Sequence, residues 1–260
     1  MAWGLSHALF VPPRKQPAAS AEQALFQQIQ RVYLPLSYTG RDAVCRFEPG
    51  DRVQPGDPLA LPENDDPAPV KSSVEGVFDG TRTLSHPVYG PITCAVIRPA
   101  IMPTPRAESD KRISPTPAQV MAAAKAAGII DELDGLPLHQ KLEQWKHEGC
   151  HFLVANAVEA EPYASSAWSL LLHQSEQVNS GLWLAAQTIG AAGSHIAVQA
   201  SRKARQELPP SLDGRLFFVK SGYPVTALTH AGHDIRVGVI GVQACLALHR
   251  AVTLHEHHHY

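Results

Sequence analysis

A short apolar run that leads into two acids constrains the fold most. The segment FLVANAVEAEPY, residues 152–163, begins with β-forming apolar residues and continues through Asn156 to Glu159 and Glu161, before Tyr163. Such runs are typical of buried parallel strands, and ligands of α/β proteins bind beyond the carboxyl ends of these strands. We therefore expect an α/β fold with these four side chains at a binding site. The alternative is a strand followed by a solvated loop.

Strands and helices alternate through the second half of the chain. The clearest helix begins at Pro117, with Thr116 as its cap, and ends at Gly128. Further helices are expected at 138–147, 166–191, 202–208 and 239–254, and strands at 150–156, 195–200 and 215–220. This order predicts a mostly parallel α/β sheet.

Residues 32–99 have a different pattern, with short alternating strands separated by Gly and Pro turns. The segments FEPGDRVQPGDPL, 47–59, and PVKSSVEGVF, 69–78, resemble the two halves of a barrel-sandwich hybrid, the fold of biotinyl and lipoyl carriers. A carrier has its modified Lys at the hairpin tip, here residues 63–66. That tip has no Lys, and Lys71 falls in a predicted strand, so we expect a structural module.

The chain is therefore expected to have five parts. These are an N-terminal arm with a short helix (1–31), a barrel-sandwich β module (32–100), a Pro-rich linker (101–116), an α/β domain (117–254) and a His-rich tail (255–260). Imidazoles of the tail could bind a transition metal, but a disordered chain end is the expectation, and no metal site is predicted.

Residues 152–163 resemble the N-A-x-E-C-E-P-Y segment of the C subunit of the Rnf electron-transport complex, with Ala160 in place of the cysteine. This family is related to the flavin-bearing, NADH-oxidising subunit of respiratory complex I. Weaker matches in the same order include LPL before a Gly, a G-D-x-V-x-x-G-D turn, a segment ending at Gly76, and GLPLHQKL. The resemblance implies a flavoprotein-like domain. The family's cofactor-binding positions would be Gly135, Lys141, Asn156, Glu159, Glu161 and Tyr163, with Lys141 near an anionic group.

Two departures from the family pattern concern the flavin mononucleotide (FMN). The family's glycine-rich loop corresponds to residues 129–138, which keep only Gly135 and add Asp131, Glu132 and Asp134. Acids near a phosphate position are repulsive. The family's Asn-Val-Gly-Thr turn corresponds to 241–244, which read Gly-Val-Gln-Ala. We therefore expect no cofactor, with FMN and NADH binding as the alternative.

Four separated cysteines provide no C-x-x-C pair. The family's cysteine-rich ferredoxin-like segments have no counterpart in this sequence, so no iron–sulfur cluster is expected. No order of Ser, His and Asp supports a hydrolase, and no catalytic residue is assigned.

The composition excludes several classes of protein. With 44% hydrophobic and 18% charged residues and a net charge of −2, the chain is globular and has no basic footprint for nucleic acid. No apolar run is long enough to span a bilayer, and the N-terminus lacks the order of a secretory signal. We expect a cytoplasmic protein. The resemblance implies protein partners in a membrane-associated complex and a peripheral position at the inner face of the membrane.

Three functions follow. The expected one is a degenerate Rnf C-like protein with an eroded flavin site, which acts as a binding or assembly component. The alternatives are a working FMN- and NADH-dependent electron-transfer subunit, whose Glu159 and Glu161 lie near the flavin ring, and a small-molecule binding module.

Overall fold

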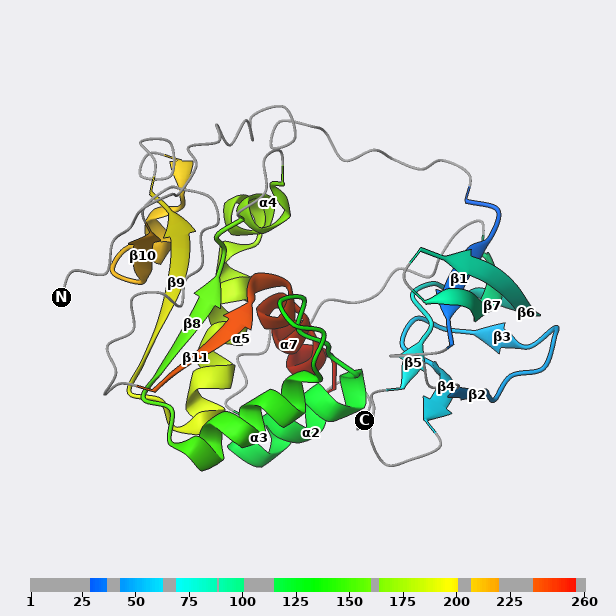
Figure 1. Ribbon diagram of the computed structural model, residues 1–260, viewed down its shortest axis with the longest axis horizontal. Helices are drawn as coiled ribbons and strands as arrows, with labels where there is room; N and C mark the ends of the chain where they lie inside the picture. Colours follow the sequence, from blue (N-terminus) through cyan, green and yellow to red (C-terminus); the bar gives the residue numbers. More distant parts are fainter. Residues whose placement is uncertain are drawn as a thin grey trace. The chain divides into compact units, whose positions relative to one another are not determined.

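The computed structural model describes residues 29–36, 43–62, 69–87, 89–100, 115–159, 164–200, 207–219 and 236–255 (Figure 1). The chain divides into two compact units. The first comprises Ala24–Asp110 and Lys125–Ile129, and the second comprises Met1–Gln23, Lys111–Ala124 and Ile130–Tyr260. The predicted N-terminal helix, the hairpin tip, the Pro-rich segment and the helix at 202–208 lie wholly or largely outside the described residues.

The first unit contains two antiparallel sheets. One has the order β1 (Val32–Pro35), β7 (Gly90–Pro99), β6 (Gly76–His86), β3 (Arg52–Val53), and the other has the order β2 (Ala43–Cys45), β4 (Pro58–Pro62), β5 (Val70–Lys71). Leu59 of one sheet packs in a common core with Phe78 and Ile97 of the other. The predicted barrel-sandwich fold of this unit is confirmed.

The sequence Pro-Gly-Asp occurs at 49–51 and again at 55–57, and each copy forms a tight turn. Gly50 has φ 103° and Gly56 has φ 95°, values that residues with a side chain rarely adopt. The aspartate that follows each glycine accepts a hydrogen bond from the backbone N–H three residues earlier, at 2.8 and 2.7 Å. These turns give the module its closely spaced short strands.

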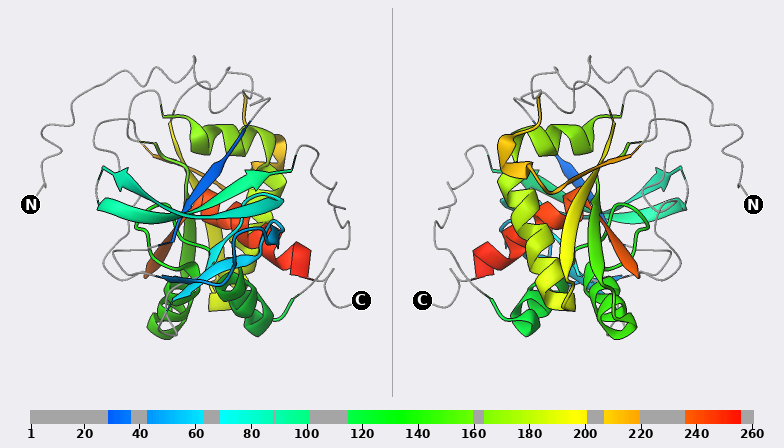
Figure 2. Two further views of the ribbon diagram at one scale, coloured as in Figure 1. Left: turned by 90° about the vertical axis from the view of Figure 1, so that its right-hand side faces the viewer. Right: turned by 90° about the vertical axis from the view of Figure 1, so that its left-hand side faces the viewer.

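The second unit has a four-stranded parallel sheet with the order β10 (Leu216–Val219), β9 (Gly193–Gln199), β8 (Phe152–Asn156), β11 (Val237–Gly241). Among the described residues, the helices are α2 (Pro117–Ala127), α3 (Leu138–Glu148), α4 (Ser166–His173), α5 (Ser175–Ile189) and α7 (Val242–His255), with a 3-10 turn, η1 (Pro210–Leu212). Helices α5 and α7 lie side by side on one face of the sheet (Figures 1 and 2). The predicted α/β fold with a parallel sheet is confirmed.

Helices α5 and α7 approach each other closely at Gly181. A Cβ at this position would collide with the backbone carbonyl of Cys245 on α7. Both residues are buried, and Leu182 beside them is fully excluded from solvent. The missing side chain at Gly181 therefore allows the two helices to pack backbone against backbone.

Two predicted elements differ from the observed ones. The single helix expected at 166–191 is two helices, because the chain breaks at Gln174, whose φ is −136°. The final helix expected from Val239 begins only at Val242, and the preceding residues form strand β11. The run Val-Gly-Val-Ile-Gly leads directly into α7 without an intervening loop, so its apolar pattern merges with that of the helix.

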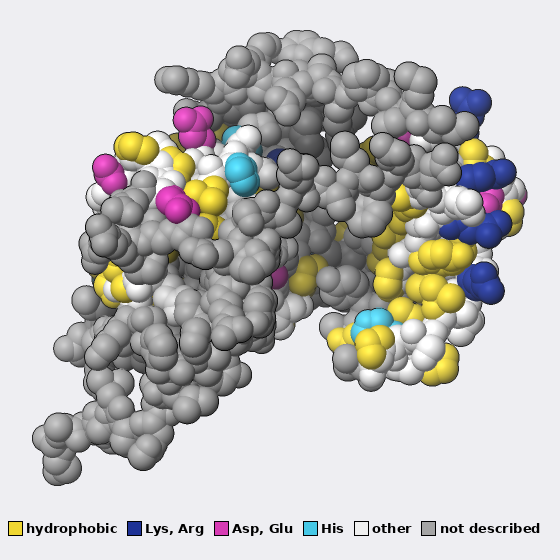
Figure 3. Space-filling model, turned by 90° about the horizontal axis from the view of Figure 1, so that it is seen from above, with side chains coloured by type: hydrophobic (Ala, Val, Ile, Leu, Met, Phe, Trp, Pro, Cys, Tyr) yellow, Lys and Arg dark blue, Asp and Glu magenta, His cyan; other side chains and the backbone are white. Residues whose placement is uncertain are grey.

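The surface of the first unit has interspersed charges. In Figure 3 its basic side chains stand beside exposed hydrophobic ones, with acidic side chains between them. Asp79 lies 3.0 Å from the guanidinium of Arg98 and 3.8 Å from that of Arg31. Within the described ranges, none of the helices has the length and apolar character needed to cross a membrane.

Candidate functional site

The carboxyl ends of β8 and β11 lie next to each other in the sheet. Asn156, the last residue of β8, is the register partner of Gly241, the last residue of β11, and of Ala197 in β9. Helix α7 begins directly after Gly241. Asn156 and the N-terminus of α7 therefore lie at the edge of the sheet where α/β proteins bind ligands.

The loop between α2 and α3 is closed on itself. Ile130 and Pro137 form an isolated β-bridge, and Asp131 N–H donates to the carbonyl of Leu136 at 2.9 Å. Gly135, with φ 73°, donates to the carbonyl of Asp131 at 2.9 Å. Gly135 thus allows the turn to form, because few other residues adopt this conformation without strain.

Lys141 of α3 is held by two carboxylates of this loop. Its Nζ lies 2.5 Å from Oδ2 of Asp131 and 2.6 Å from Oδ2 of Asp134, and 5.1 Å from the ring centre of Trp145. Asp131 is fully buried and the Lys141 side chain is only 6% exposed, whereas the Asp134 side chain is 40% exposed. In this structure the anionic groups beside Lys141 are carboxylates of the chain itself.

Glu132 binds the N-terminus of α7. Its Oε1 accepts the N–H of Gln243 at 2.7 Å, and its Oε2 accepts that of Ala244 at 3.0 Å. Oδ1 of Asp131 accepts the N–H of Gly241 at 3.1 Å. Burial of the carboxylate raises the pKa of Glu132, and the charge of Asp131 raises it further, while the backbone hydrogen bonds oppose the shift.

Asn156 and Glu159 stabilise local structure. Oδ1 of Asn156 accepts the N–H of Val158 at 3.0 Å, which forms a turn after the strand. Oε1 of Glu159 accepts the N–H of Ala167 at 2.9 Å and the hydroxyl of Ser166 at 3.0 Å. Glu159 therefore caps α4, as acids at helix N-termini commonly do.

Of the six positions expected from the family resemblance, Glu161 and Tyr163 lie outside the described residues. The structure brings Gly135 and Lys141 together in the loop network, and it places Asn156 beside the start of α7 in the sheet. The roles of Asp131, Glu132 and Asp134 were missed. The partners of Asp131 and Glu132 at Gly241–Ala244 are more than 100 positions away, and no local pattern indicates such a pairing.

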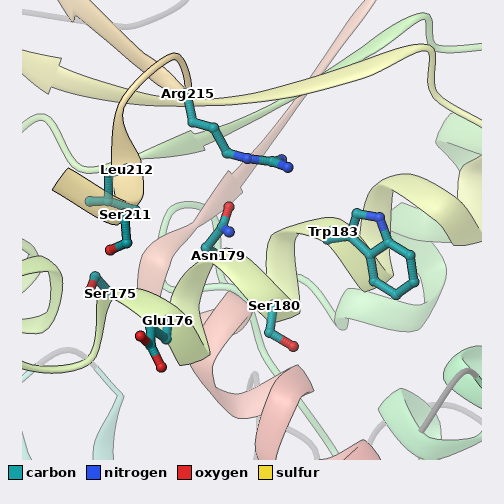
Figure 4. Close-up of a pocket in the computed structure, with 8 residues that line it drawn as sticks. All are labelled: Ser175, Glu176, Asn179, Ser180, Trp183, Ser211, Leu212 and Arg215. Carbon is teal, nitrogen blue, oxygen red and sulfur yellow. The ribbon is translucent and has the colours of Figure 1, made fainter. Parts of the chain in front are cut away.

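A pocket separate from the sheet edge lies beside α5. It has a volume of about 200 Å³ and is lined by residues of α5, by η1 and by Arg215 (Figure 4). The amide of Asn179 points toward Arg215, and its Oδ1 is buried without a hydrogen-bond donor from any described residue. Among the described residues, the guanidinium of Arg215 donates one hydrogen bond, to Ser194 Oγ at 3.5 Å. Trp183 adds a ring that is 41% exposed.

The four cysteines are unpaired thiols. Burial raises the pKa of Cys94, Cys150 and Cys245, which favours the neutral thiol in each case. In the part of the chain that the structure describes, no three His, Cys, Asp or Glu side chains gather in a group that could hold a metal ion.

Residues 125–211 match the Nuo51 FMN-binding domain family. The match covers about a third of the chain. It begins in α2 and includes the closed loop, Lys141, β8 and the pocket residues of α5. This part of the chain is thus similar to an FMN-binding domain.

Partial similarity extends to two crystal structures of NAD+-reducing NiFe-hydrogenase. The H2-reduced form superimposes with a TM-score of 0.41 at 18% identity, over 52% of this chain and 31% of that chain. The air-oxidised form gives 0.42 and 19%, over 52% and 30%. This chain therefore spans about a third of the length of the hydrogenase chains. No curated protein sequence matches it.

The expectation of no cofactor is contradicted by the match to an FMN-binding domain. The prediction treated the acids of residues 131–134 as unpaired charges around a phosphate position. In the structure, Asp131 and Asp134 bind Lys141, and Glu132 binds backbone N–H groups. Because these acids have partners of their own, their presence does not exclude a flavin.

Proposed function

We propose that this chain is an FMN-binding electron-transfer component of a multi-subunit redox complex, and that its function resembles that of the Rnf C subunit. The observation that carries the proposal is the match of residues 125–211 to the Nuo51 FMN-binding domain. The parallel sheet, with Asn156 and the start of α7 at its carboxyl edge, supports it. The Rnf-like order of motifs on both sides of the matched segment supports the finer assignment.

Not every group at the carboxyl edge of the parallel sheet is suited to binding FMN. A flavin phosphate is commonly bound by backbone N–H groups at a helix N-terminus. At α7 these groups are already bound by Glu132 and Asp131, so they do not fit a phosphate in the conformation described. We therefore assign no residue of α7 to the phosphate.

Protein partners belong to the same proposal. Leu133 and Leu136, in the closed loop beside the site, are 41% and 48% exposed. Exposed apolar side chains next to a redox site are suited to contact with another subunit. Binding to such a partner would also give this chain an assembly role and a peripheral position at the membrane.

The test is the visible absorption spectrum of the purified full chain, followed by anaerobic titration with FMN and then NADH. A flavin band that remains with the protein through gel filtration, and is bleached by NADH, is the expected result. Failure of FMN to bind at micromolar concentrations would contradict the proposal. FMN binding without bleaching by NADH would restrict the function to a different electron donor.

A second candidate function is small-molecule binding at the α5 pocket. Arg215 has no ion-pair partner among the described residues, and the buried Oδ1 of Asn179 lacks a donor. A small acid with an N–H or O–H group would satisfy both. Thermal-shift measurement with small amino and hydroxy acids, on the wild-type protein and on Arg215→Met, tests this function. A shift that survives the substitution would contradict it.

A further inference from the structure

The backbone N–H groups at the start of α7 require an anion or a set of hydrogen-bond acceptors. The first N–H groups of a helix have no acceptor within the helix, and the helix dipole gives this end a partial positive charge. Here the helix follows β11 directly, without a Ser, Thr, Asp or Asn at its boundary to act as a cap. Acceptors for the N–H groups of Gly241–Ala244 must therefore come from another part of the chain.

Glu132 supplies these acceptors with both of its carboxylate oxygens. Each oxygen accepts one N–H, from Gln243 at 2.7 Å and from Ala244 at 3.0 Å. Asp131 binds the adjacent N–H of Gly241. Two consecutive acids of one loop thus accept three of the four backbone N–H groups of Gly241–Ala244 at the start of the helix. This paired arrangement is the one expected of an anion bound by a helix N-terminus.

The backbone at Gly241 is shaped around this carboxylate. A Cβ at Gly241 would collide with all three atoms of the Glu132 carboxylate group. The loop that carries Glu132 is itself fixed, because Ile130 pairs with Pro137 and Lys141 binds the carboxylate of Asp131. The start of α7 and the closed loop between α2 and α3 therefore both hold Glu132 in place.

We infer that Glu132 is a built-in replacement for a ligand phosphate at the N-terminus of α7. A phosphate at this point would compete with the carboxylate for the same N–H groups and would lie close to a second acid, Asp131, at a cost in repulsion. The consequence for flavins rests on the proposed function: the chain recognises a flavin without a contribution from its phosphate at α7. Glu132 is thus a specificity-determining residue.

The first experiment does not depend on flavin. Melting temperatures of the full-length wild type, Glu132→Ala, Glu132→Gln and the control Glu143→Ala are measured in phosphate and in chloride of equal ionic strength. Glu143 is an exposed acid of α3. We expect Glu132→Ala to melt about 2–4 °C lower in chloride, the effect of losing a helix cap in a chain of this size. Phosphate should restore much of this loss and change the wild type no more than the control.

Two results would overturn the inference. If phosphate stabilises the wild type as much as it stabilises Glu132→Ala, the N-terminus of α7 is open to anions. If both Glu132 variants melt at the wild-type temperature, Glu132 does not hold the helix. Should Glu132→Ala fail to fold, the same comparison is made with Glu132→Gln, which keeps the size of the side chain but loses its charge.

The second experiment compares FMN with riboflavin, which lacks the phosphate. The wild type should bind both with Kd values within about threefold, a difference under 1 kcal/mol, whereas Glu132→Gln should bind FMN more tightly than riboflavin. Tenfold tighter binding of FMN than of riboflavin by the wild type would overturn the inference. If neither flavin binds while the phosphate results are as expected, the proposed function fails and the assignment of Glu132 stands.

Discussion

The ammonium group of Lys141 lies 2.5 Å from the carboxylate of Asp131, and both are shielded from solvent. Lys141→Met would leave the Asp131 charge buried without its cation. We expect a loss of about 3–5 kcal/mol in the free energy of unfolding, the usual effect of breaking a buried ion pair. Urea denaturation measures it.

Asp134→Asn provides the matched comparison for Lys141→Met. Asp134 binds the same ammonium at 2.6 Å, but its side chain is 40% exposed. Its loss should therefore cost about 1 kcal/mol or less. Equal effects of the two substitutions would mean that burial does not decide the strength of this network.

Glu159→Ala should destabilise α4. The substitution removes the acceptor of the Ala167 N–H and of the Ser166 hydroxyl, and the loss of such a cap costs about 1 kcal/mol. Hydrogen exchange should become faster at Ala167 and in the first turn of α4, while Glu143→Ala should leave α4 unchanged. If instead Glu159→Ala stabilises the protein, repulsion between acids outweighs the cap.

Gly181→Ala should disturb the contact between α5 and α7. The added methyl group would collide with the carbonyl of Cys245, so the helices must separate. We expect a loss of about 1–3 kcal/mol, the range for overpacking a close contact, although Ala is otherwise the better helix former. Gln187→Ala, at an exposed position of the same helix, is the control and should be neutral or slightly stabilising. Stabilisation by Gly181→Ala would show that the two helices are free to separate.

Local patterns account for the elements that could be predicted. Thr116 accepts the N–H of Gln119, whose side chain binds the N–H of Thr116, and Gly128 ends the same helix with φ 65°. These cap residues lie next to the helix that they delimit, so the sequence reveals both ends of α2.

The parts that could not be predicted depend on distant contacts. The break at Gln174 has no Pro or Gly, and its side chain accepts a hydrogen bond from Arg250 of α7 at 2.8 Å. The binding of Glu132 to α7 joins residues 111 and 112 positions apart. From the sequence, Asp131 and Glu132 could only be interpreted as negative charges, because their donors at the start of α7 become neighbours only after folding.

His249 should make the stability of the second unit depend on pH. Its Nδ1 lies 3.0 Å from the hydroxyl of Ser180, between α7 and α5. Burial, and next the charge of Arg250, lower the pKa of His249 below its ordinary value of 6.5. The unfolded chain therefore takes up a proton at this residue at a higher pH than the folded chain does. The contribution of neutral His249 to stability is fully present above about pH 6.5 and is lost as pH falls through the lower folded pKa. Unfolding in urea at several pH values should show a loss of stability in acid that is smaller for His249→Asn, which keeps a hydrogen-bonding group without the charge. Identical pH profiles for the two proteins would mean that His249 is as readily protonated in the folded state as in the unfolded one.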